Sequence, residues 1–265
     1  MKVVLFCGGY GMRMRDGVTD LPKPMTPLGN RPLLWHVMRY YAHFGHKEFI
    51  LCLGFGARHI KDYFLDYRET ASNDFIMRGE SRAVQLLGQD IHDWTITFVD
   101  TGRDTAIGER LRRVADLLED DEMFLANYAD ILTDAPLDVM VDDLRTSPDA
   151  LAALLAVRPQ SAFHVVDLQD GDYVTRIRQV SELPMRENGG YFVFRRELLD
   201  HIAPGEDLVS DVLARLSQKS AVKAFQHDGF WQPADTLKER ALLESMYQQG
   251  QRPWAPWDTN HRGKQ

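Results

Sequence analysis

Cysteine is scarce in this chain, with only Cys7 and Cys52 among 265 residues. Both lie in short apolar runs that are typical of buried strands, so we expect two small core side chains in a reducing compartment. The chain also has no Cys/His spacing typical of a metal site. These absences exclude a Cys/His metal centre as the basis of function.

Long apolar runs and an excess of positive charge are also missing. Lys and Arg number 31 against 39 Asp and Glu, and the resulting net charge of -8 disfavours broad nucleic-acid binding through phosphate neutralisation. No stretch is long enough to span a membrane. The apolar run Lys2–Cys7 is too short for a signal peptide and leads into glycines. We predict a cytoplasmic protein with neither a nucleic-acid nor a membrane partner.

Residues 2–157 alternate between short apolar runs and helical patterns. The predicted strands and helices, in chain order, are Lys2–Cys7, Arg31–Phe44, Lys47–Leu53, His59–Tyr67, Trp94–Val99, Glu109–Leu118, Met123–Asn127, Leu137–Leu144 and Leu151–Val157. Strand, helix and strand at these spacings imply parallel pairing with right-handed crossovers. The fold class predicted is therefore α/β, with a doubly wound sheet.

The pattern changes after about residue 159. A hairpin, a strand and two helices are predicted at Phe163–Leu168 with Tyr173–Val180, Tyr191–Phe194, Asp207–Ser217 and Thr236–Gln248. We expect this half to add antiparallel strands and a lid-like subregion to the same sheet. The polar segment Glu69–Gln89 has irregular periodicity and is interpreted as an excursion or an interface. The prediction is one domain over residues 1–265, with halves at 1–158 and 159–250 and a tail at 251–265.

The loop after the first strand carries three glycines, Gly8, Gly9 and Gly11. Ligands of open parallel sheets bind beyond the carboxyl ends of the strands, and glycines let backbone N–H groups approach an anion. A dinucleotide fold fits badly, because some twenty residues of loop precede the first convincing helix and no acid closes the second strand. A Walker phosphate loop is absent, since no Gly-Lys-Ser/Thr follows the glycines.

Two cations follow these glycines. Arg13 offers a fork for phosphate oxygens, and Lys23 offers a compact charge. Pro22 and Pro24 are expected to hold Lys23 in an extended segment. Together the two cations are suited to a triphosphate and its pyrophosphate leaving group, although each alone is compatible with an ordinary surface position.

Two aspartates are candidate metal ligands. Asp130 follows the predicted strand Met123–Asn127, at the edge of the sheet where ligands bind, and Asp235 precedes the last long helix. Mg²⁺ prefers oxygen ligands and is often held by one or two carboxylates plus substrate phosphates. Helix capping is the alternative role for Asp235. An in-line displacement assisted by such an ion needs no protein nucleophile.

Taken together, these segments resemble bacterial glucose-1-phosphate cytidylyltransferase, of the sugar-phosphate nucleotidyltransferase family. The resemblance extends from residue 1 to about 257. It rests on GGYGMRMR (8–15), LPKPM (21–25), WH (35–36), GERLRRV (108–114), YAD (128–130), NGGYFVF (188–194) and GFWQPADT (229–236). It implies a Rossmann-like mixed sheet with an added antiparallel sugar-binding subregion, and a homo-oligomer.

The resemblance also implies roles for particular residues. Nucleotide binding is predicted for Gly8, Gly9, Tyr10, Gly11, Met12, Arg13, Lys23 and Arg110. Mg²⁺ is the implied cofactor, with Asp130 and Asp235 as its ligands, and these two with Arg13 and Lys23 form the predicted catalytic set. The predicted contacts to the sugar phosphate are Tyr128, Arg178, Glu182, Arg186, Asn188 and Gly189.

The chain departs from the family pattern at three places. Met12 stands where the family has Thr, and Ala129 stands where it has Gly. The family also carries a lysine near residue 180 that grips the sugar phosphate, and here Val180 or Leu183 takes its place. Losing a cation from a desolvated phosphate contact costs several kcal/mol unless it is replaced. We therefore consider Arg178 and Arg186 as substitutes.

The leading hypothesis is a transferase that joins CTP and a sugar 1-phosphate, with glucose 1-phosphate or a relative as the acceptor. One alternative keeps the chemistry but changes the phosphorylated acceptor or the nucleoside triphosphate. Another is a non-catalytic protein that binds nucleotides or nucleotide sugars. A structural interaction module fits least, because it does not account for a loop that bears both the glycines and Lys23.

Overall fold

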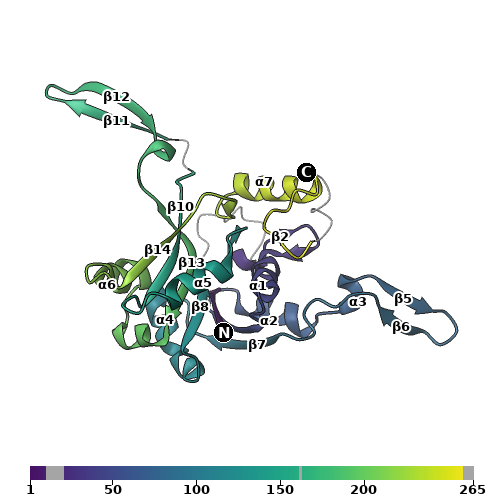
Figure 1. The fold of residues 1–265 in the computed structure, drawn as a ribbon. Helices are drawn as coiled ribbons and strands as arrows, with labels where there is room; N and C mark the ends of the chain where they lie inside the picture. The colour runs from purple at the N-terminus through teal and green to yellow at the C-terminus, as the bar shows by residue number, and fades with distance from the viewer. Residues whose placement is uncertain (10–20, 161–162, 259–265) are drawn as a thin grey trace.

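A seven-stranded sheet forms the centre of the molecule, in the order β14-β10-β13-β8-β1-β4-β7 (Figure 1). The computed structural model describes residues 1–9, 21–160 and 163–258. In chain order the strands of this sheet are β1 (Val3–Phe6), β4 (Glu48–Leu53), β7 (Thr95–Asp100), β8 (Met123–Asn127), β10 (Ala152–Val157), β13 (Glu187–Arg195) and β14 (Val222–His227).

The half of the sheet that contains β1 is parallel. Strand β1 pairs in parallel with β4 and β8, and β4 pairs in parallel with β7. Strand β13 runs antiparallel to both β8 and β10. The predicted doubly wound α/β fold with added antiparallel pairing is confirmed. Because β4 and β7 extend from one side of β1 and β8 returns on the other, the strand order reverses between β1 and β8.

Both faces of the sheet are covered, and for that reason its central strands β1, β4 and β8 are apolar with little alternation. Val3 and Leu5 point into one apolar cluster, while Val4 and Phe6 point into the other, as the two-residue period of a strand requires. The first face is covered by α1 (Leu33–His43), α2 (Ala57–Leu65), α5 (Leu137–Arg145) and α7 (Leu237–Gln248). The second is covered by α4 (Ile107–Arg113), η3 (Ala115–Leu118), η6 (Leu208–Leu213) and α6 (Ala214–Ser217).

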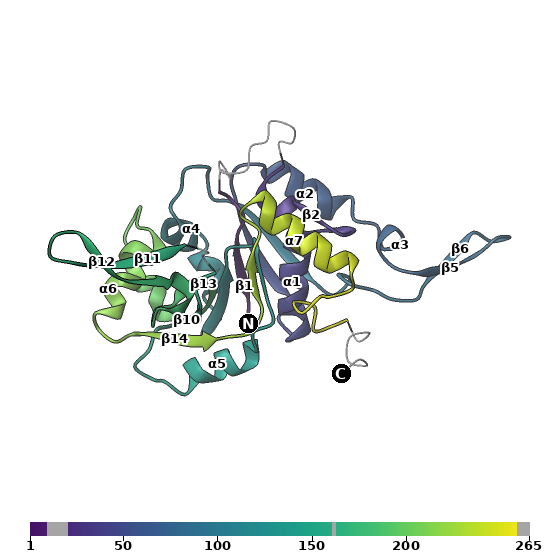
Figure 2. The same cartoon turned by 90° about the horizontal axis from the view of Figure 1, so that it is seen from above.

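Two hairpins extend from the body in opposite directions (Figures 1 and 2). One contains β11 (His164–Gln169) and β12 (Tyr173–Gln179), and the predicted hairpin is therefore confirmed. It forms its own two-stranded sheet, so the antiparallel strand that this half of the chain adds to the central sheet is β13 and not the hairpin. The other consists of β5 (Phe75–Arg78) and β6 (Ala83–Leu86) after the short helix α3 (Glu69–Ser72). The irregular segment 69–89 is thus an excursion with regular pairing inside it.

Several element boundaries differ from the prediction. The first helix begins at Leu33, because β3 (Arg31–Pro32) pairs with β2 (Pro27–Leu28). The predicted helix 109–118 is split into α4 and the 3-10 turn η3, and the one at 207–217 begins as a π-helical turn. The strand β14 was not predicted, and β13 begins four residues earlier than expected.

A short sheet joins the segment after β8 to the segment before α7. Here β9 (Ile131–Thr133) pairs with β15 (Trp231–Pro233) in antiparallel register. The remaining short turns are η2 (Lys23–Met25), η4 (Val180–Glu182) and η5 (Arg196–His201). Among the described residues, no helix has the length and apolar character needed to cross a membrane.

Candidate active site

A cavity of about 640 Å³ opens at the carboxyl ends of the parallel strands. Its wall includes Phe6 and Cys7 from the end of β1, and Tyr128 and Asp130 from beyond the end of β8. It therefore lies where the strand order reverses, which is where open α/β sheets bind ligands. Its volume falls within the range of small-molecule sites.

Lys23 reaches this cavity from the turn η2. Pro22 is extended, with φ -67° and ψ 149°, and its carbonyl accepts the N–H of Met25 at 2.8 Å. The ring of Pro22 packs against Gly56, where a Cβ atom would lie only 2.7 Å from it. Lys23 itself begins a 3-10 turn, so the predicted extended conformation is wrong at this residue. The flanking prolines nevertheless fix the turn that carries the ammonium group.

Asp130 follows a strained turn after β8. Ala129 has a φ of 63°, in the left-handed region that favours glycine. Its N–H donates to the Asn127 side chain at 2.6 Å, and the Asp130 carbonyl accepts from Ala234 N–H at 3.0 Å. The departure from the family noted at Ala129 therefore falls on a residue whose backbone conformation suits glycine.

The environment of the Asp130 side chain is unfavourable for a negative charge. Burial raises the pKa of this carboxyl to about 6 from an ordinary value of 3.8, and the charge of Asp235 adds to the effect. The nearby Lys23 ammonium acts in the opposite direction and only partly offsets it. A carboxylate in this position is stabilised by additional positive charge.

Asp235 does not cap the helix that follows it. Thr236 is the N-cap of α7, and it forms a reciprocal capping box with Glu239. The Glu239 carboxylate accepts the backbone N–H groups of both Asp235 and Thr236, at 2.9 and 2.8 Å. These contacts involve the backbone N–H of Asp235 and not its side chain. The Asp235 carboxylate is therefore available to another partner.

That partner is Lys23, which joins the two candidate metal ligands. Its ammonium nitrogen lies 2.6 Å from a carboxylate oxygen of Asp235 and 3.5 Å from one of Asp130. Residues more than a hundred positions apart in the chain thus meet around one positive charge. Among the described residues, no group of three or more His, Cys, Asp or Glu side chains forms a metal cluster. Two carboxylates leave the remaining positions of an ion to phosphate oxygens and water.

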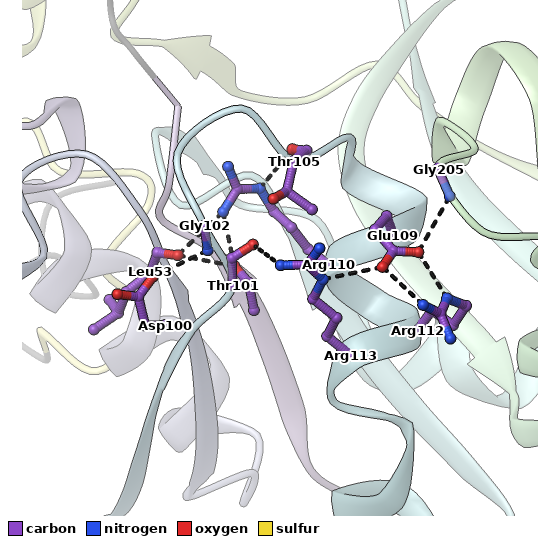
Figure 3. Close-up of polar contacts among 10 residues, drawn as sticks. All are labelled: Leu53, Asp100, Thr101, Gly102, Thr105, Glu109, Arg110, Arg112, Arg113 and Gly205. Atoms are coloured by element: carbon purple, nitrogen blue, oxygen red, sulfur yellow. Dashed lines mark hydrogen bonds and ion pairs between the residues drawn. The ribbon is translucent and has the colours of Figure 1, made fainter.

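The floor beneath the start of the glycine loop contains Arg110 (Figure 3), which is 2% exposed. One of its terminal nitrogens donates to the Gly8 carbonyl at 2.8 Å. The close approach requires glycine, because a Cβ atom on Gly8 would lie 2.2 Å from the guanidinium. Five hydrogen bonds to protein groups use all five N–H donors of this side chain. The predicted contact between Arg110 and CTP stays a prediction, and it requires the guanidinium to exchange one of these bonds.

Opposite Lys23, the cavity is lined by neutral and acidic groups. Tyr128 and Asn188, both predicted, line it, and their side chains are 3.4 Å apart. Gly189 lies behind them, and its carbonyl accepts the indole N–H of Trp231 at 2.8 Å. Three lining residues with carboxylate or amide side chains were not predicted from the sequence, namely Gln160 and Glu187 here and Glu239 near Asp235. Glu187 directly precedes the NGGY motif, and this position could have identified it from the sequence.

Three predicted acceptor residues lie outside the cavity wall. Arg178 makes a two-pronged ion pair with Asp167, at 2.8 and 2.9 Å, on the β11–β12 hairpin. Arg186 donates to backbone carbonyls at the ends of β10 and β14 and pairs with Asp228 at 2.9 Å. Glu182 belongs to the turn η4. None of the three lines the described cavity, and their assignment as acceptor contacts stays a prediction.

The remaining predicted residues belong to the glycine loop. Gly9 lines the cavity. Tyr10, Gly11, Met12 and Arg13 lie outside the described residues. The part of the predicted site that is brought together is therefore Gly9, Lys23, Asp130 and Asp235, with Tyr128 and Asn188 opposite.

Comparison with known proteins gives the same family for the whole chain. A family model described as Nucleotidyl transferase matches residues 2–250. The chain is 35% identical over 263 residues to glucose-1-phosphate cytidylyltransferase of Salmonella typhi, a match that covers 97% of this chain and 100% of that protein. It is also 35% identical over 259 residues to a probable glucose-1-phosphate cytidylyltransferase of Bacillus subtilis (strain 168), with the same coverage.

A solved structure shares the fold. It is that of a putative glucose-1-phosphate thymidylyltransferase from Bacillus anthracis, which superposes with a TM-score of 0.68 at 14% identity and covers 93% of this chain and 94% of that one. At this identity the likeness concerns the fold alone. The full-length sequence matches are closer and confirm the predicted resemblance, and the chain belongs to the nucleotidyl transferase family of enzymes.

Proposed function

We propose that this enzyme transfers the cytidylyl group of CTP to glucose 1-phosphate, or to a close relative, and releases pyrophosphate. The observation that carries the proposal is the meeting of Lys23, Asp130 and Asp235 in one cavity at the reversal of strand order. The chain is similar over nearly its whole length to glucose-1-phosphate cytidylyltransferases, and this similarity supports the choice of both substrates.

In the proposed reaction, a phosphate oxygen of the sugar phosphate attacks the α-phosphorus of CTP in line with the leaving group. A new P–O bond forms to the sugar phosphate, and the bond to the β-phosphate oxygen breaks, so that pyrophosphate departs. No protein nucleophile takes part. The contribution of the protein is positioning and electrostatic stabilisation, as in other phosphoryl-type transfers.

Asp130 and Asp235 fit the needs of a divalent cation, and we assign Mg²⁺ to them. Both carboxylates already reach one cation, the Lys23 ammonium, and burial raises the pKa of Asp130 even with that ammonium nearby. When bound, the ion offsets negative charge on the phosphate oxygens. With the carboxylates paired to the ion, the Lys23 ammonium is free to bind phosphate oxygens itself.

The cavity then has two ends. The nucleotide end consists of Gly9, Lys23, Asp130 and Asp235. Nucleotide contacts by Gly8, Tyr10, Gly11, Met12 and Arg13 stay predictions from the sequence. The acceptor end consists of Tyr128, Gln160, Glu187 and Asn188. At the acceptor end the described side chains offer hydrogen-bonding groups suited to sugar hydroxyls and no cation.

That composition favours one variant of the function. The lysine expected near residue 180 is absent from the sequence, and Glu187 adds a negative charge where a phosphorylated acceptor binds. The same chemistry on a different phosphorylated acceptor, with more hydrogen-bond donors facing Glu187, is therefore the second candidate. We also propose that the chain has two halves, at 1–158 and 159–250, that it forms a homo-oligomer and that it is located in the cytoplasm.

The test is a matrix of pyrophosphate release, with each of the four common nucleoside triphosphates against a set of sugar 1-phosphates and cyclitol phosphates in the presence of Mg²⁺. We expect CTP to be the best donor and glucose 1-phosphate to be among the best acceptors. Good turnover of CTP with another acceptor, and poor turnover with glucose 1-phosphate, would select the second candidate. Absence of release from every pair would refute transferase activity and favour a binding protein.

A further inference from the structure

The two segments that carry the candidate metal ligands are paired with each other along their backbones. In the β9–β15 sheet, Ile131 is the register partner of Pro233. Beyond this pair, the N–H of Ala234 donates to the carbonyl of Asp130 at 3.0 Å. The backbone N–H of Asp235 is the next donor along the chain, and it lies beyond this pairing. It therefore needs an acceptor from another part of the molecule.

Glu239 supplies that acceptor from the first turn of α7. One of its carboxylate oxygens, Oε2, accepts the N–H of Asp235 at 2.9 Å and that of Thr236 at 2.8 Å. In return, the Thr236 hydroxyl accepts the N–H of Glu239 at 3.2 Å. A capping box consists of the two bonds between Thr236 and Glu239, and the bond from Asp235 is additional to it. Glu239 thus holds the backbone from which the Asp235 carboxylate extends.

Glu239 does not act as a third metal ligand. It lines the same cavity as Asp130 and Asp235. Within residues 1–9, 21–160 and 163–258, however, no three His, Cys, Asp or Glu side chains are grouped so that they could hold an ion together. The contacts of the Glu239 carboxylate are instead with backbone N–H groups at the start of α7. Its arrangement therefore suits the support of a ligand and not direct coordination.

The second half of α7 is attached to the segment that follows Lys23. The Glu244 carboxylate accepts the N–H of Gly29 at 2.8 Å, and the Tyr247 hydroxyl donates to the Asn30 side chain at 3.1 Å. Gly29 and Asn30 form the turn between β2 and β3, directly after η2 and β2. Gly29 has a φ of 61°, and a Cβ atom on it would lie 2.1 Å from the Tyr247 ring. One helix therefore connects the segment that provides the ammonium group with the segment that provides one of its carboxylate partners.

From these contacts we infer that Glu239 is a positioning residue, which holds the Asp235 carboxylate within reach of the ion that it shares with Asp130. The inference rests on the proposed function in one respect, that these two aspartates bind Mg²⁺. Replacing a side chain that supports a metal ligand typically lowers the metal affinity by about 10- to 100-fold. Without Glu239, the N–H of Asp235 loses its acceptor, and the carboxylate is no longer fixed opposite Asp130.

Three substitutions separate the reach of the Glu239 side chain from its charge. Glu239→Gln keeps an oxygen at the same distance from the backbone and removes the charge. Glu239→Asp keeps the charge and shortens the side chain, and Glu239→Ala removes both. The probe is Mn²⁺, whose binding is titrated by electron paramagnetic resonance in the presence of a non-hydrolysable CTP analogue. We expect Glu239→Gln to stay within about 3-fold of the wild-type affinity, and Glu239→Asp and Glu239→Ala to weaken it on the order of 10-fold. The Mg²⁺ dependence of pyrophosphate release should follow the same order.

Thr236→Ala is the matched control. It removes the other half of the capping box, the bond from the N–H of Glu239, and keeps the bond between Glu239 and the N–H of Asp235. We expect it to lower the melting temperature about as much as Glu239→Ala does, because both variants lose helix capping. Its affinity for Mn²⁺ should remain that of the wild type.

Several outcomes would overturn the positioning role. Equal weakening in Glu239→Gln and Glu239→Ala would mean that Glu239 acts through its charge, and wild-type affinity in Glu239→Asp and Glu239→Ala would mean that its reach has no effect. A matching loss of affinity in Thr236→Ala would reduce Glu239 to a helix cap. Should the wild-type protein bind no Mn²⁺ with the CTP analogue, the proposed function itself fails. If Glu239→Ala does not fold, the comparison of Glu239→Gln with Glu239→Asp still decides the outcome.

Discussion

At the nucleotide end of the cavity the described charged groups Lys23, Asp130 and Asp235 are paired with one another, whereas at the acceptor end the Glu187 carboxylate has no hydrogen-bond or ion-pair partner among the described residues. Lys23 bridges two carboxylates, and Arg110 uses all five donors beneath Gly8. Opposite them, the 3.4 Å contact between Asn188 and Tyr128 is a long one. The step shared by the family, cleavage of a triphosphate, is thus pre-organised, and the groups that would select the acceptor are less constrained.

The largest expected effect comes from removing one charge at the nucleotide end. Asp130→Asn should reduce kcat/KM on the order of 10³-fold, because it removes a metal-ligating charge that stabilises the transition state. It should not reduce stability at pH 7, since the ionised carboxylate is itself unfavourable at this buried position. Pyrophosphate-release kinetics and thermal melting measure the two quantities separately.

Asp134→Asn is the matched control for that variant. Asp134 lies four residues further along and pairs with His227 at 2.8 Å, away from the described cavity wall. The variant Asp134→Asn should keep wild-type turnover. A parallel loss of turnover and melting temperature in Asp130→Asn would instead assign Asp130 a structural role.

A second expected effect is on pH dependence. The pKa of Asp130 in the folded protein is raised to about 6 from 3.8, so its ionisation opposes folding. The protonated carboxyl carries no such cost, so its contribution to stability is fully present below about pH 4. This contribution is lost as the pH rises through about 6 and Asp130 ionises in the folded protein. In chelator-treated protein, the difference in stability between Asp130→Asn and wild type should grow across this window. A constant difference from pH 4 to pH 8 would contradict the raised pKa.

A smaller effect is expected at the acceptor end. Glu187→Ala should raise the KM of the acceptor by roughly tenfold, about 1.4 kcal/mol, through loss of one hydrogen bond to a sugar hydroxyl. The KM of CTP should stay unchanged. The acceptor KM of Glu187→Gln should lie between those of the wild type and Glu187→Ala. Equal changes in both KM values would show that the two ends are not separate.

The smallest effect is expected at the turn between the two ends. Ala129→Gly should relieve the left-handed backbone at φ 63°. It should raise the free energy of unfolding by about 0.5–1 kcal/mol, the gain from relieved strain exceeding the added freedom of the unfolded chain. Denaturant unfolding measures this difference. A loss of stability would mean that the buried methyl group contributes more than the strain costs.

The sequence predicted the parallel sheet well, because its buried strands are apolar on both faces. Met123–Asn127 was predicted to the residue, and the others to within about two residues, apart from β13, for which the prediction began four residues late. The projecting β5–β6 hairpin was missed, since its exposed strands carry no alternation toward a core. Strand β14 was missed for a similar reason: its half-buried residues mix charged and apolar types.

For the site, the motifs pointed to residues that do meet, namely Lys23, Asp130 and Asp235. Sequence alone could not assign the capping of α7 to Thr236, because Asp235 and Thr236 are both good N-cap residues. Nor could it show that the Arg110 guanidinium bonds to protein acceptors, since Gly8 and Leu53 lie in loops distant in sequence. Nor could it show the pairing of Arg178 with Asp167, because the two residues meet across a hairpin.

The most direct test of the difference between the nucleotide end and the acceptor end is calorimetric binding of each substrate alone. CTP with Mg²⁺ should bind the free enzyme, because the groups that hold it are already in place. Glucose 1-phosphate should bind measurably only when Mg²⁺ and a non-hydrolysable CTP analogue are present, since the described acceptor end offers its phosphate no cation. Binding of glucose 1-phosphate that is equally tight with and without nucleotide would contradict the account.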